Sequence, residues 1–358
     1  MTKKIKVVVS GVGNRALPKD PDRSNWYGWI DLISKSEGFE LVAAHDPSDE
    51  SLKRVIDRGY LGHRDVYTDL TEMLTSKNCD AILISNPAEY HAGTLQQAVD
   101  RGLHILVEKP FVTDIEQGKK IVNAMEKQGL ISCVIQNWRY KDVGRKIFKA
   151  IKDGRLGRVG HIFFRYVRNR ENPNYPKYIF EETYPLLYAM GIHHFDLFRY
   201  VLDDEILSVG GSSFKPPWSM YKSETGVNLY FETKKGTPVV YTGTISSANN
   251  SIFQENLIIE GEKGSLVNES HWLEPPLWFY PSGGGERIEL TAEIVDNSTR
   301  QQYDISDRYI LDRFYKSVAF GEEEICPARS GLMSVCVVEA SRLACETGRR
   351  ILLSDILS

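Results

Sequence analysis

The segment Ile5-Lys-Val-Val-Val-Ser-Gly-Val-Gly-Asn-Arg-Ala16 joins a run of β-branched residues directly to a glycine-containing turn. The run predicts a buried strand at Ile5–Val9, because valine and isoleucine pack well on a pleated surface. The turn fits the pattern G-x-G-x-x-A: Gly11 permits a tight bend, Gly13 lets the backbone approach a pyrophosphate, and Ala16 allows close helix–strand packing. The segment therefore predicts a dinucleotide-binding turn, with phosphate at the N-terminal end of the following helix.

The turn is followed by a polar segment rather than directly by a helix. Leu17–Asn25 contains two prolines and several charged residues. Regular apolar spacing comes later, with Trp26, Ile30 and Ile33 on one face of a helix predicted over 26–36. We therefore expect Leu17–Asn25 to loop out between the turn and the helix.

An acidic residue after the second strand is the next feature that a dinucleotide site needs. Glu40–Ala44 is predicted as that strand, and Asp46 follows it, placed to bind both ribose hydroxyls. A carboxylate here repels a 2′-phosphate, which favours NAD over NADP, although the nearby cations Lys53 and Arg54 leave NADP open. Because a carboxylate before Pro47 is also common in a solvated turn, the assignment depends on the rest of the site.

The composition is that of a soluble globular protein. The 358 residues are 42% hydrophobic and 26% charged, with a formal net charge of −4 at pH 7. This balance gives no sign of a nucleic-acid partner, and no apolar run approaches the ~18 residues of a membrane-spanning helix. The five cysteines are scattered and form no CxxC pair, which indicates a reducing, cytoplasmic location and offers no metal site.

The chain length and the pattern of elements predict two domains. From Ile5 to Gln136, short β-branched runs alternate with helical segments, which is typical of a parallel sheet covered by helices on both faces. Beyond residue 138, strands group into hairpins, such as Val227–Thr233 with Val239–Ser246, and helices lie at the margins. We predict an α/β fold: a doubly wound parallel Rossmann sheet over 1–138, and an α+β domain with a mostly antiparallel sheet over 139–358.

Two further motifs carry a family resemblance: Ile84-Ser-Asn-Pro-Ala-Glu-Tyr-His91 and Gly102-Leu-His-Ile-Leu-Val-Glu-Lys-Pro110. They resemble the glucose-fructose oxidoreductase, inositol dehydrogenase and rhizopine-catabolism (Gfo/Idh/MocA) oxidoreductases, whose pattern is an Asn-Pro or Thr-Pro turn, a histidine about four residues on, and Gly-x-His-Val-x-x-Glu-Lys-Pro. The resemblance extends to the end of the chain, where Gly348–Leu353 is similar to the family's Gly-Arg-x-Val-x-Leu tail. It implies a large open-faced sheet in the second domain and a homodimer or homotetramer.

The resemblance also implies roles for individual residues. Lys109 is expected near the nicotinamide and the substrate hydroxyl, where an ammonium can stabilise a developing alkoxide, and Pro110 is expected after a cis or strained bond. A nearby cationic nicotinamide would lower the lysine pKa. The fingerprint and the motifs together give the expected cofactor-binding residues as Gly11, Gly13, Asn14, Arg15, Asp46, Ser85, Asn86, Pro87, His91, Glu108 and Lys109.

The second catalytic element is Gly191-Ile-His-His-Phe-Asp196, which resembles the family's Asp/Glu-x-Gly-x-His-x-x-Asp on a helix of the second domain. His193 falls on the catalytic histidine, and a side chain of this type can accept the hydroxyl proton as hydride leaves carbon. Asp196, three residues later, either orients the ring or forms a salt bridge to another helix. His194 points about 100° away around the helix, so the two histidines do not face the same site.

One position departs from the family pattern. The carboxylate expected four residues before the histidine is Ala189, which puts the acid–base assignment in doubt. Four nearby residues are candidates to replace it, and the sequence does not choose among Tyr184, Tyr188, Glu181 and Glu182. The remaining residues expected to bind substrate are Arg139, Tyr140, Tyr184 and His194.

The sequence supports one main function and two alternatives. The main prediction is an NAD-dependent dehydrogenase acting on a secondary hydroxyl of a sugar, inositol or related polyol, with Lys109 and His193 as catalytic residues. The resemblance also covers NAD-dependent glycosidases, which oxidise a sugar transiently, eliminate the aglycone and reduce the product again. A non-catalytic regulator that binds cofactor and sugar is the third possibility, and Ala189 is the feature that favours it.

Overall fold

The computed structural model of the chain describes residues 4–249, 254–270, 272–293 and 298–358; the charged start at residues 1–3 lies outside them. The chain forms two compact units, and neither is continuous in sequence. The first contains Met1–Asn137 with Tyr303–Val335, and the second contains Trp138–Gln302 with Cys336–Ser358. The units meet between Asn137 and Trp138, at the boundary that the sequence predicts, but 33 residues late in the chain belong to the first unit rather than the second.

The first unit is built on a six-stranded parallel sheet with the order β3-β2-β1-β4-β5-β6. This is the doubly wound order, in which the chain reverses direction across the sheet between β1 and β4. The strands are β1 (Ile5–Ser10), β2 (Phe39–His45), β3 (Val66–Tyr67), β4 (Ala81–Ile84), β5 (His104–Glu108) and β6 (Ser132–Ile135). The predicted Rossmann sheet is therefore confirmed.

The helices of this unit begin and end at residues that suit them. Asp69 and Asp114 accept hydrogen bonds from backbone N–H groups at the starts of α3 and α5, and Gly129 ends α5 in a left-handed conformation. The helices are α1 (Trp29–Ser34), α2 (Asp49–Asp57), α3 (Leu70–Ser76), α4 (His91–Asp100) and α5 (Ile115–Gln128). Helix α1 starts three residues later than predicted, because residues up to Gly28 are not helical.

Helix α8 (Thr299–Phe320) and the start of α9 (Ala328–Thr347) complete the first unit. Phe314 on α8 stacks on Phe39 of β2, with ring centroids 6.3 Å apart. Glu324, after α8, accepts a hydrogen bond from the backbone N–H of Ser132 on β6. These contacts explain why a segment so far along the chain folds with the first sheet.

The second unit contains a nine-stranded sheet with the order β14-β13-β12-β11-β7-β10-β9-β8-β15. All neighbouring pairs are antiparallel except β7 and β10, which are parallel. The strands are β7 (Val159–Val167), β8 (Ile206–Phe214), β9 (Gly226–Thr233), β10 (Pro238–Thr244), β11 (Gln254–Gly261), β12 (Gly264–Asn268), β13 (Leu277–Pro281), β14 (Ile288–Glu289) and β15 (Ile351–Leu352). The predicted antiparallel α+β architecture is confirmed, and β9 and β10 form the predicted hairpin.

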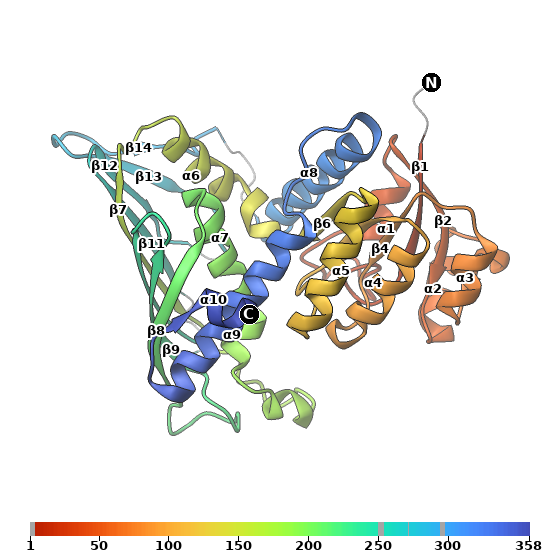
Figure 1. Cartoon of the computed structure of the whole chain (residues 1–358), viewed down its shortest axis with the longest axis horizontal. Coiled ribbons are helices and arrows are strands. Elements are labelled where there is room, and N and C mark those ends of the chain that lie inside the picture. Colours follow the sequence, from red (N-terminus) through yellow and green to blue (C-terminus); the bar gives the residue numbers. More distant parts are fainter. Residues whose placement is uncertain (1–3, 250–253, 271, 294–297) are drawn as a thin grey trace. The chain divides into compact units, whose positions relative to one another are not determined.

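Helices α6 (Asp142–Lys152) and α7 (Ile192–Leu202) pack on one face of this sheet, and the short helix α10 (Leu353–Leu357) follows β15 (Figure 1). Phe198 of α7 meets Phe164 of β7, and Phe195 of α7 meets Phe231 of β9, with ring centroids 5.6 and 4.9 Å apart. The residues between these buried positions, such as Phe163, are exposed on the opposite face. The sheet is thus covered on one side within this unit, as the predicted open-faced sheet requires.

The second-domain helix that carries His193 does not begin as a regular α-helix. A π turn at Leu187–Gly191 precedes α7. In a π turn the hydrogen bonds join residues five apart, so the helical register before His193 is shifted relative to a regular α-helix.

Among the described residues, no helix is both long enough and apolar enough to span a bilayer.

Candidate functional site: a dinucleotide cavity

A cavity of about 810 Å³ lies in the first unit at the carboxyl ends of β1, β2 and β4. This is the topological switch point, where doubly wound sheets bind their ligands. The predicted residues that line it come from the glycine turn, from the end of β2 and from the end of β4. The start of α4 adds residues that sequence reasoning missed. Its lining comprises Gly11, Gly13, Arg15, His45, Asp46, Pro47, Ser85, Asn86, Pro87, Glu89, Tyr90, Gly93, Thr94 and Gln97. The spacing of Tyr90, Thr94 and Gln97, which repeats along one helical face, is the signal that would have found them.

The two glycines of the fingerprint, Gly11 and Gly13, have different structural roles. Gly11 has φ +90°, and a Cβ there would lie 2.3 Å from the backbone nitrogen of Asn86. Glycine is therefore required for the turn and for its close approach to the end of β4. A Cβ on Gly13 would meet no atom nearer than Ser85 O at 4.0 Å, so its backbone faces open space in the cavity. The predicted tight turn at Gly11 is confirmed.

The glycine turn is joined to α1 by backbone hydrogen bonds, although a loop separates them in the sequence. Leu17 N donates to Gly13 O at 2.9 Å, which is the spacing of an α-helix. Trp29 N and Ile30 N then donate to the carbonyl oxygens of Arg15 and Ala16, at 3.2 and 3.0 Å. The turn thus forms the first turn of the helix, and the chain leaves it at Pro18 and returns at Gly28. We call Pro18–Gly28 the excursion loop.

This arrangement corrects the expected phosphate position. The first N–H groups of α1 already donate to Arg15 and Ala16, so they are not available to a ligand. Within the described ranges, the N–H groups of Gly13 and Asn14 donate to no protein acceptor. Among the described residues, the donors left for a ligand are therefore those of the glycine turn, which stands in for the helix N-terminus.

Buried polar atoms without partners test whether a dinucleotide fits. Ser85 Oγ and Asn86 Oδ1 are buried and have no hydrogen-bond partner in the part of the chain that is described. Leaving such groups unsatisfied costs about 1–3 kcal/mol each. Both residues line the cavity, while Asn86 Nδ2 donates to Thr94 Oγ1 at 2.8 Å. A ligand with ribose, phosphate and amide groups supplies the missing partners, so the residues present fit a dinucleotide.

Asp46 is held by the backbone at the edge of the cavity. Its Oδ2 accepts from Val12 N at 2.7 Å, and its Oδ1 accepts from Ser48 N at 2.9 Å. Arg54, the cation that left NADP open, donates to Val12 O at 2.9 Å. The carboxylate is therefore preorganised beside the glycine turn, with lone pairs left for ribose hydroxyls.

Replacing Asp46 with alanine is expected to weaken NAD binding by about tenfold to a hundredfold, since a hydrogen bond to a charged group contributes about 1.5–3 kcal/mol. NADP binding should be unchanged or tighter, because the charge that repels the 2′-phosphate is gone. Calorimetric titration with both dinucleotides measures this, with Asp49→Asn, in the first turn of α2, as the matched control. Equal weakening of NAD and NADP would contradict the assignment.

His91 joins the two sequence motifs instead of facing the cofactor. Its Nδ1 lies 2.7 Å from Pro110 O and its Nε2 lies 3.0 Å from Asn86 O. Both neighbours are carbonyl acceptors, and the side chain is buried. The expected cofactor contact at His91 is therefore replaced by a bridge between the Ser-Asn-Pro turn and Lys109-Pro110, whose peptide bond is cis.

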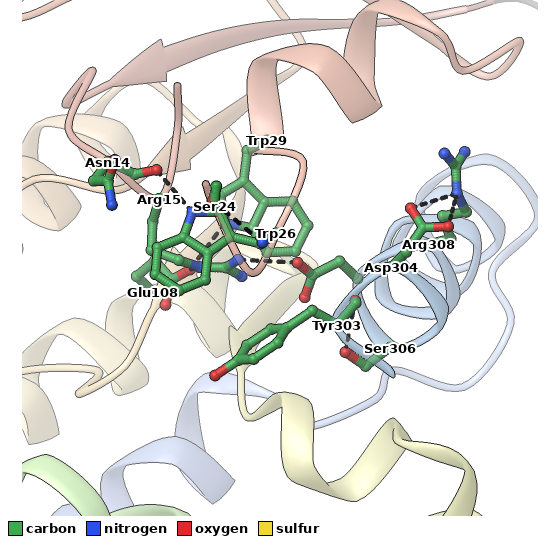
Figure 2. Close-up of polar contacts among 11 residues, drawn as sticks. Asn14, Arg15, Ser24, Trp26, Trp29, Glu108, Tyr303, Asp304, Ser306 and Arg308 are labelled. Carbon is green, nitrogen blue, oxygen red and sulfur yellow. Dashed lines mark hydrogen bonds and ion pairs between the residues drawn. The ribbon is translucent and has the colours of Figure 1, made fainter. Parts of the chain in front are cut away.

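Arg15 and Glu108 form an ion pair with each other. Arg15 Nε donates to Glu108 Oε1 at 2.8 Å (Figure 2). Arg15 Nη1 donates to Asp307 Oδ2 at 3.0 Å. Glu108 Oε1 also accepts from Trp29 Nε1 at 2.9 Å. Sequence reasoning missed Asp307 and Trp29, and Asp307 gave no signal because it is 292 residues from Arg15. Arg15 and Glu108 were both predicted to bind the cofactor, and both hydrogen-bond protein groups.

In the second unit, His193 and His194 lie on α7 in different surroundings. His193 is mostly buried and stacks near Trp138, with ring centroids 6.0 Å apart. His194 is 0% exposed and lies among the rings of Phe164, Tyr166 and Tyr241. Its Nδ1 is 3.0 Å from Tyr241 Oη. His194 is therefore a core residue, and the expected substrate contact is not supported by this position.

The burial of His194 predicts a pH dependence of stability. Desolvation lowers its pKa to about 3, whereas the unfolded chain titrates near ~6.5. The folded state stays neutral while the unfolded state takes up a proton, so the stabilisation present above pH 6.5 is lost as pH falls towards 3. Between pH 7.5 and 5 this amounts to about 2 kcal/mol.

Urea unfolding of the wild type and of His194→Gln, at pH 7.5 and 5, checks this prediction. The variant lacks the titrating group, so it should lose about 2 kcal/mol less than the wild type over the same pH interval. His161, exposed on β7, provides the matched control as His161→Gln, which should retain the wild-type pH dependence. Parallel pH profiles for the wild type and His194→Gln would show that His194 is not the neutral core residue described above.

The other residues expected at the substrate are mostly buried within the second unit. Arg139 Nε and Nη2 donate to the two oxygens of Asp196, each at 2.5 Å, so the salt-bridge interpretation of Asp196 is the one observed. Tyr140 packs its ring against Tyr200, with centroids 5.9 Å apart. Tyr184 is buried, with φ +48°, just before the π turn. Their expected substrate contacts stay predictions.

The candidates for the missing carboxylate are spread out. Tyr188, in the π turn, donates from Oη to Glu339 Oε2 at 3.1 Å, and its pKa is raised by burial and by that carboxylate. Glu181 pairs with Lys222 at 2.5 Å. Burial raises the pKa of Glu182. Because the π turn shifts the register, Tyr188, five residues before His193, becomes a neighbour along the helix as well as Ala189.

Comparison with known proteins places this geometry in a family. A family model described as "Oxidoreductase family, NAD-binding Rossmann fold" matches residues 5–136, and a GFO/IDH/MocA C-terminal domain model matches residues 145–267. D-apiose dehydrogenase of Paraburkholderia graminis is 22% identical over 351 residues, covering 93% of this chain and 87% of that protein. Myo-inositol 2-dehydrogenase of Thermotoga maritima is 21% identical over 328 residues, covering 88% and 92%.

A solved structure supports the fold across the whole chain. An oxidoreductase from Agrobacterium radiobacter, crystallised with NAD⁺, L-tartaric acid and magnesium, superposes with a TM-score of 0.84 at 16% identity, covering 99% of this chain and 100% of that one. Similarity at this identity establishes the architecture alone. With the two family matches and a cavity that fits a dinucleotide, the chain belongs to the Gfo/Idh/MocA oxidoreductase family, and its first unit is an NAD-binding Rossmann domain.

Proposed function

We propose that the protein is an NAD-dependent dehydrogenase that oxidises a secondary hydroxyl of a sugar, inositol or related polyol. The observation that carries the proposal is the cavity at the switch point, where Ser85 Oγ and Asn86 Oδ1 lie beside the glycine turn and have no partner among the described residues. His91 ties this same turn to Pro110, next to Lys109. The dehydrogenase names of the two relatives support the substrate class.

The cofactor supplies a hydride acceptor when it is bound. We assign its pyrophosphate to the N–H groups of the glycine turn, and its ribose hydroxyls to Asp46, which two backbone N–H groups hold in place. Ser85 and Asn86 supply further polar contacts from the end of β4. The helix-like conformation of the turn aligns its N–H dipoles with the anion.

Lys109 and His193 are assigned the chemical step. As the carbinol carbon loses hydride, its hydroxyl loses a proton, and a carbonyl forms. We assign Lys109 to the substrate oxygen, where its ammonium stabilises developing negative charge, and His193 to the hydroxyl proton. Lys109 follows Glu108, a buried carboxyl whose pKa is lowered against the effect of burial by Arg15 and Trp29 and, to a smaller extent, by the lysine charge.

A substrate screen tests the function. Purified protein is incubated with NAD or NADP and a panel of sugars, inositols and polyols, and reduced nicotinamide is followed by its absorbance. Reduction of NAD by at least one polyol is the expected result. Release of an aglycone from an aryl glycoside without net reduction would support the glycosidase instead, and NAD binding with no turnover of any compound would favour the regulator that Ala189 leaves open.

We also propose that the protein forms a homo-oligomer through the open face of its second sheet. Phe163, Val240 and Tyr230 lie side by side on β7, β10 and β9, and all three are exposed. A contiguous apolar row of this kind is typical of an interface between subunits. The expected product is a dimer or tetramer, which analytical ultracentrifugation measures.

A further inference from the structure

Arg15 is the most heavily contacted side chain of the dinucleotide fingerprint, yet its contacts are to protein groups. Its guanidinium carbon lies 5.4 Å from the ring centroid of Trp26, 4.9 Å from that of Trp29 and 5.7 Å from that of Tyr303 (Figure 2). Its nitrogens bond Glu108 and Asp307. Three rings and two carboxylates thus surround one cation, whose side chain lines the cavity with 21% of its surface exposed.

The rings come from the excursion loop, α1 and α8, so the cluster gathers separate parts of the first unit. Trp26, near the end of the loop, donates from Nε1 to Asn14 O at 2.8 Å. In an unbroken helix that carbonyl would accept from residue 18, which is proline and has no N–H. Trp26 therefore completes the glycine turn in place of the missing backbone donor, and its ring contacts Tyr303 with centroids 5.6 Å apart.

The charges of the cluster do not balance. One guanidinium faces two carboxylates, and the Asp307 side chain is 1% exposed with no partner for Oδ1 in the part of the chain described. The ionised form of Glu108 is stabilised by a hydrogen bond from the Trp29 N–H and by the charge of the neighbouring Lys109. Although burial opposes it, Arg15 and these groups keep the pKa of Glu108 low, while burial and repulsion from Glu108 and Asp304 raise the pKa of Asp307 to about 6.

We propose that Arg15 is a positioning residue and not a phosphate ligand: it holds the glycine turn, the excursion loop and Glu108 in one arrangement, and Asp307 on α8 anchors it there. Glu108 directly precedes Lys109, so the position of Arg15 also sets the end of β5 that carries the proposed catalytic lysine. A segment close to the C-terminus thereby shapes the dinucleotide site. The consequences for NAD rest on the proposed function, whereas those for the loop do not.

The first test needs no cofactor. Lys19 and Arg23 are exposed in the excursion loop, where trypsin can cut once the loop leaves its place. Arg15→Met should speed cleavage at these sites about tenfold or more, because the loop loses its central cation. Arg15→Lys should give only part of the protection, since an ammonium cannot bond both carboxylates and stack on three rings. Asp312→Asn, on the solvent side of α8 and paired with Lys316, is the matched control.

The second test separates positioning from direct phosphate binding by the sign of one effect. Asp307→Asn removes the anchor and leaves Arg15 and the turn unaltered in sequence. If Arg15 positions the turn, calorimetry should show NAD binding weakened about tenfold, and weakened further in Arg15→Met. If Arg15 binds phosphate, release from Asp307 should leave NAD binding unchanged or make it tighter, which would overturn the proposal.

The third test measures NAD affinity as a function of pH. A contact that does not titrate would give no pH dependence of this affinity. Charged or titratable groups that face Asp307 are Arg15 of the turn, Glu108 of β5, and Asp304 and Tyr303 of α8. As Asp307 takes up a proton below pH 6, the ion pair with Arg15 weakens. Wild-type NAD affinity should fall between pH 7.5 and 5, and Asp307→Asn should lack that part of the change.

The outcomes are distinguishable from failure of the proposed function. Wild-type protein that binds no NAD would refute the dehydrogenase proposal, while the protease test would still decide the role of Arg15. Unchanged tryptic protection in both Arg15→Met and Asp307→Asn would refute the positioning role. Should Arg15→Met fail to fold, the milder Asp307→Asn and Arg15→Lys variants carry the same comparisons.

Discussion

Lys109→Met is expected to lower kcat by about 10²–10³-fold on the substrate found by screening, with little change in the Kd for NAD. The size follows from the loss of a single preorganised donor to a developing oxyanion. NAD affinity should be preserved because the cavity of the first unit is lined by other residues, from the glycine turn, the end of β4 and the start of α4. A stopped-flow measurement of hydride transfer, beside calorimetry of NAD binding, gives both quantities.

The control for this experiment is Lys127→Met, an exposed lysine in the last turn of α5. It should retain the wild-type kcat. Lys109→Arg keeps the positive charge but not the compact ammonium, so partial activity is expected. Wild-type turnover in Lys109→Met would refute the assignment of the lysine, and a large loss of NAD affinity with normal turnover at saturation would move its role from chemistry to binding.

Asp196→Ala is expected to destabilise the second unit by about 3–5 kcal/mol, because it removes the carboxylate that bonds the buried Arg139 guanidinium through both oxygens. Asp196 is 0% exposed, bonds Arg139 through both oxygens and lies 3.6 Å from Arg199. The pair links the segment after β6 to α7, the helix that carries His193. Thermal unfolding followed by circular dichroism measures the loss.

Two comparisons make this prediction sharp. Asp153→Ala removes one member of the exposed Lys149–Asp153 pair and should change stability by less than about 0.5 kcal/mol. The double variant Arg139→Met/Asp196→Leu replaces both charges with apolar groups and should recover much of the stability lost in Asp196→Ala. A single variant as stable as the wild type would show that the ion pair is not the anchor described, and would strengthen the prediction that Arg139 contacts the substrate.

Much of the first sheet and its motifs was predictable from sequence because the signals are local. The β-branched run Ile5–Val9, the spacing of Gly11 and Gly13, and the strand before Asp46 each lie within a few residues. Such patterns report directly on strand burial and turn geometry. The same holds for the hairpin of β9 and β10, whose connection is short.

The role of individual polar residues was less predictable, since a side chain's partner depends on what folds beside it. His91 and Glu108 match the family pattern, and the sequence indicated contacts to a cofactor. The fold instead gives His91 two backbone carbonyls and gives Glu108 the side chains of Arg15 and Trp29. The same applies to His194, whose burial depends on the aromatic rings of β7 and β10.

The amino-acid sequence alone thus determined the Rossmann turn, the alternation of strands and helices, and the family to which the motifs point. Tertiary structure decided that the helix after the turn is split by the excursion loop, that 303–335 fold with the first unit, and that Arg15 meets Asp307. The physical reason is range: local patterns fix backbone preferences over a few residues, whereas a buried charge takes whichever partners the completed fold brings within hydrogen-bonding distance.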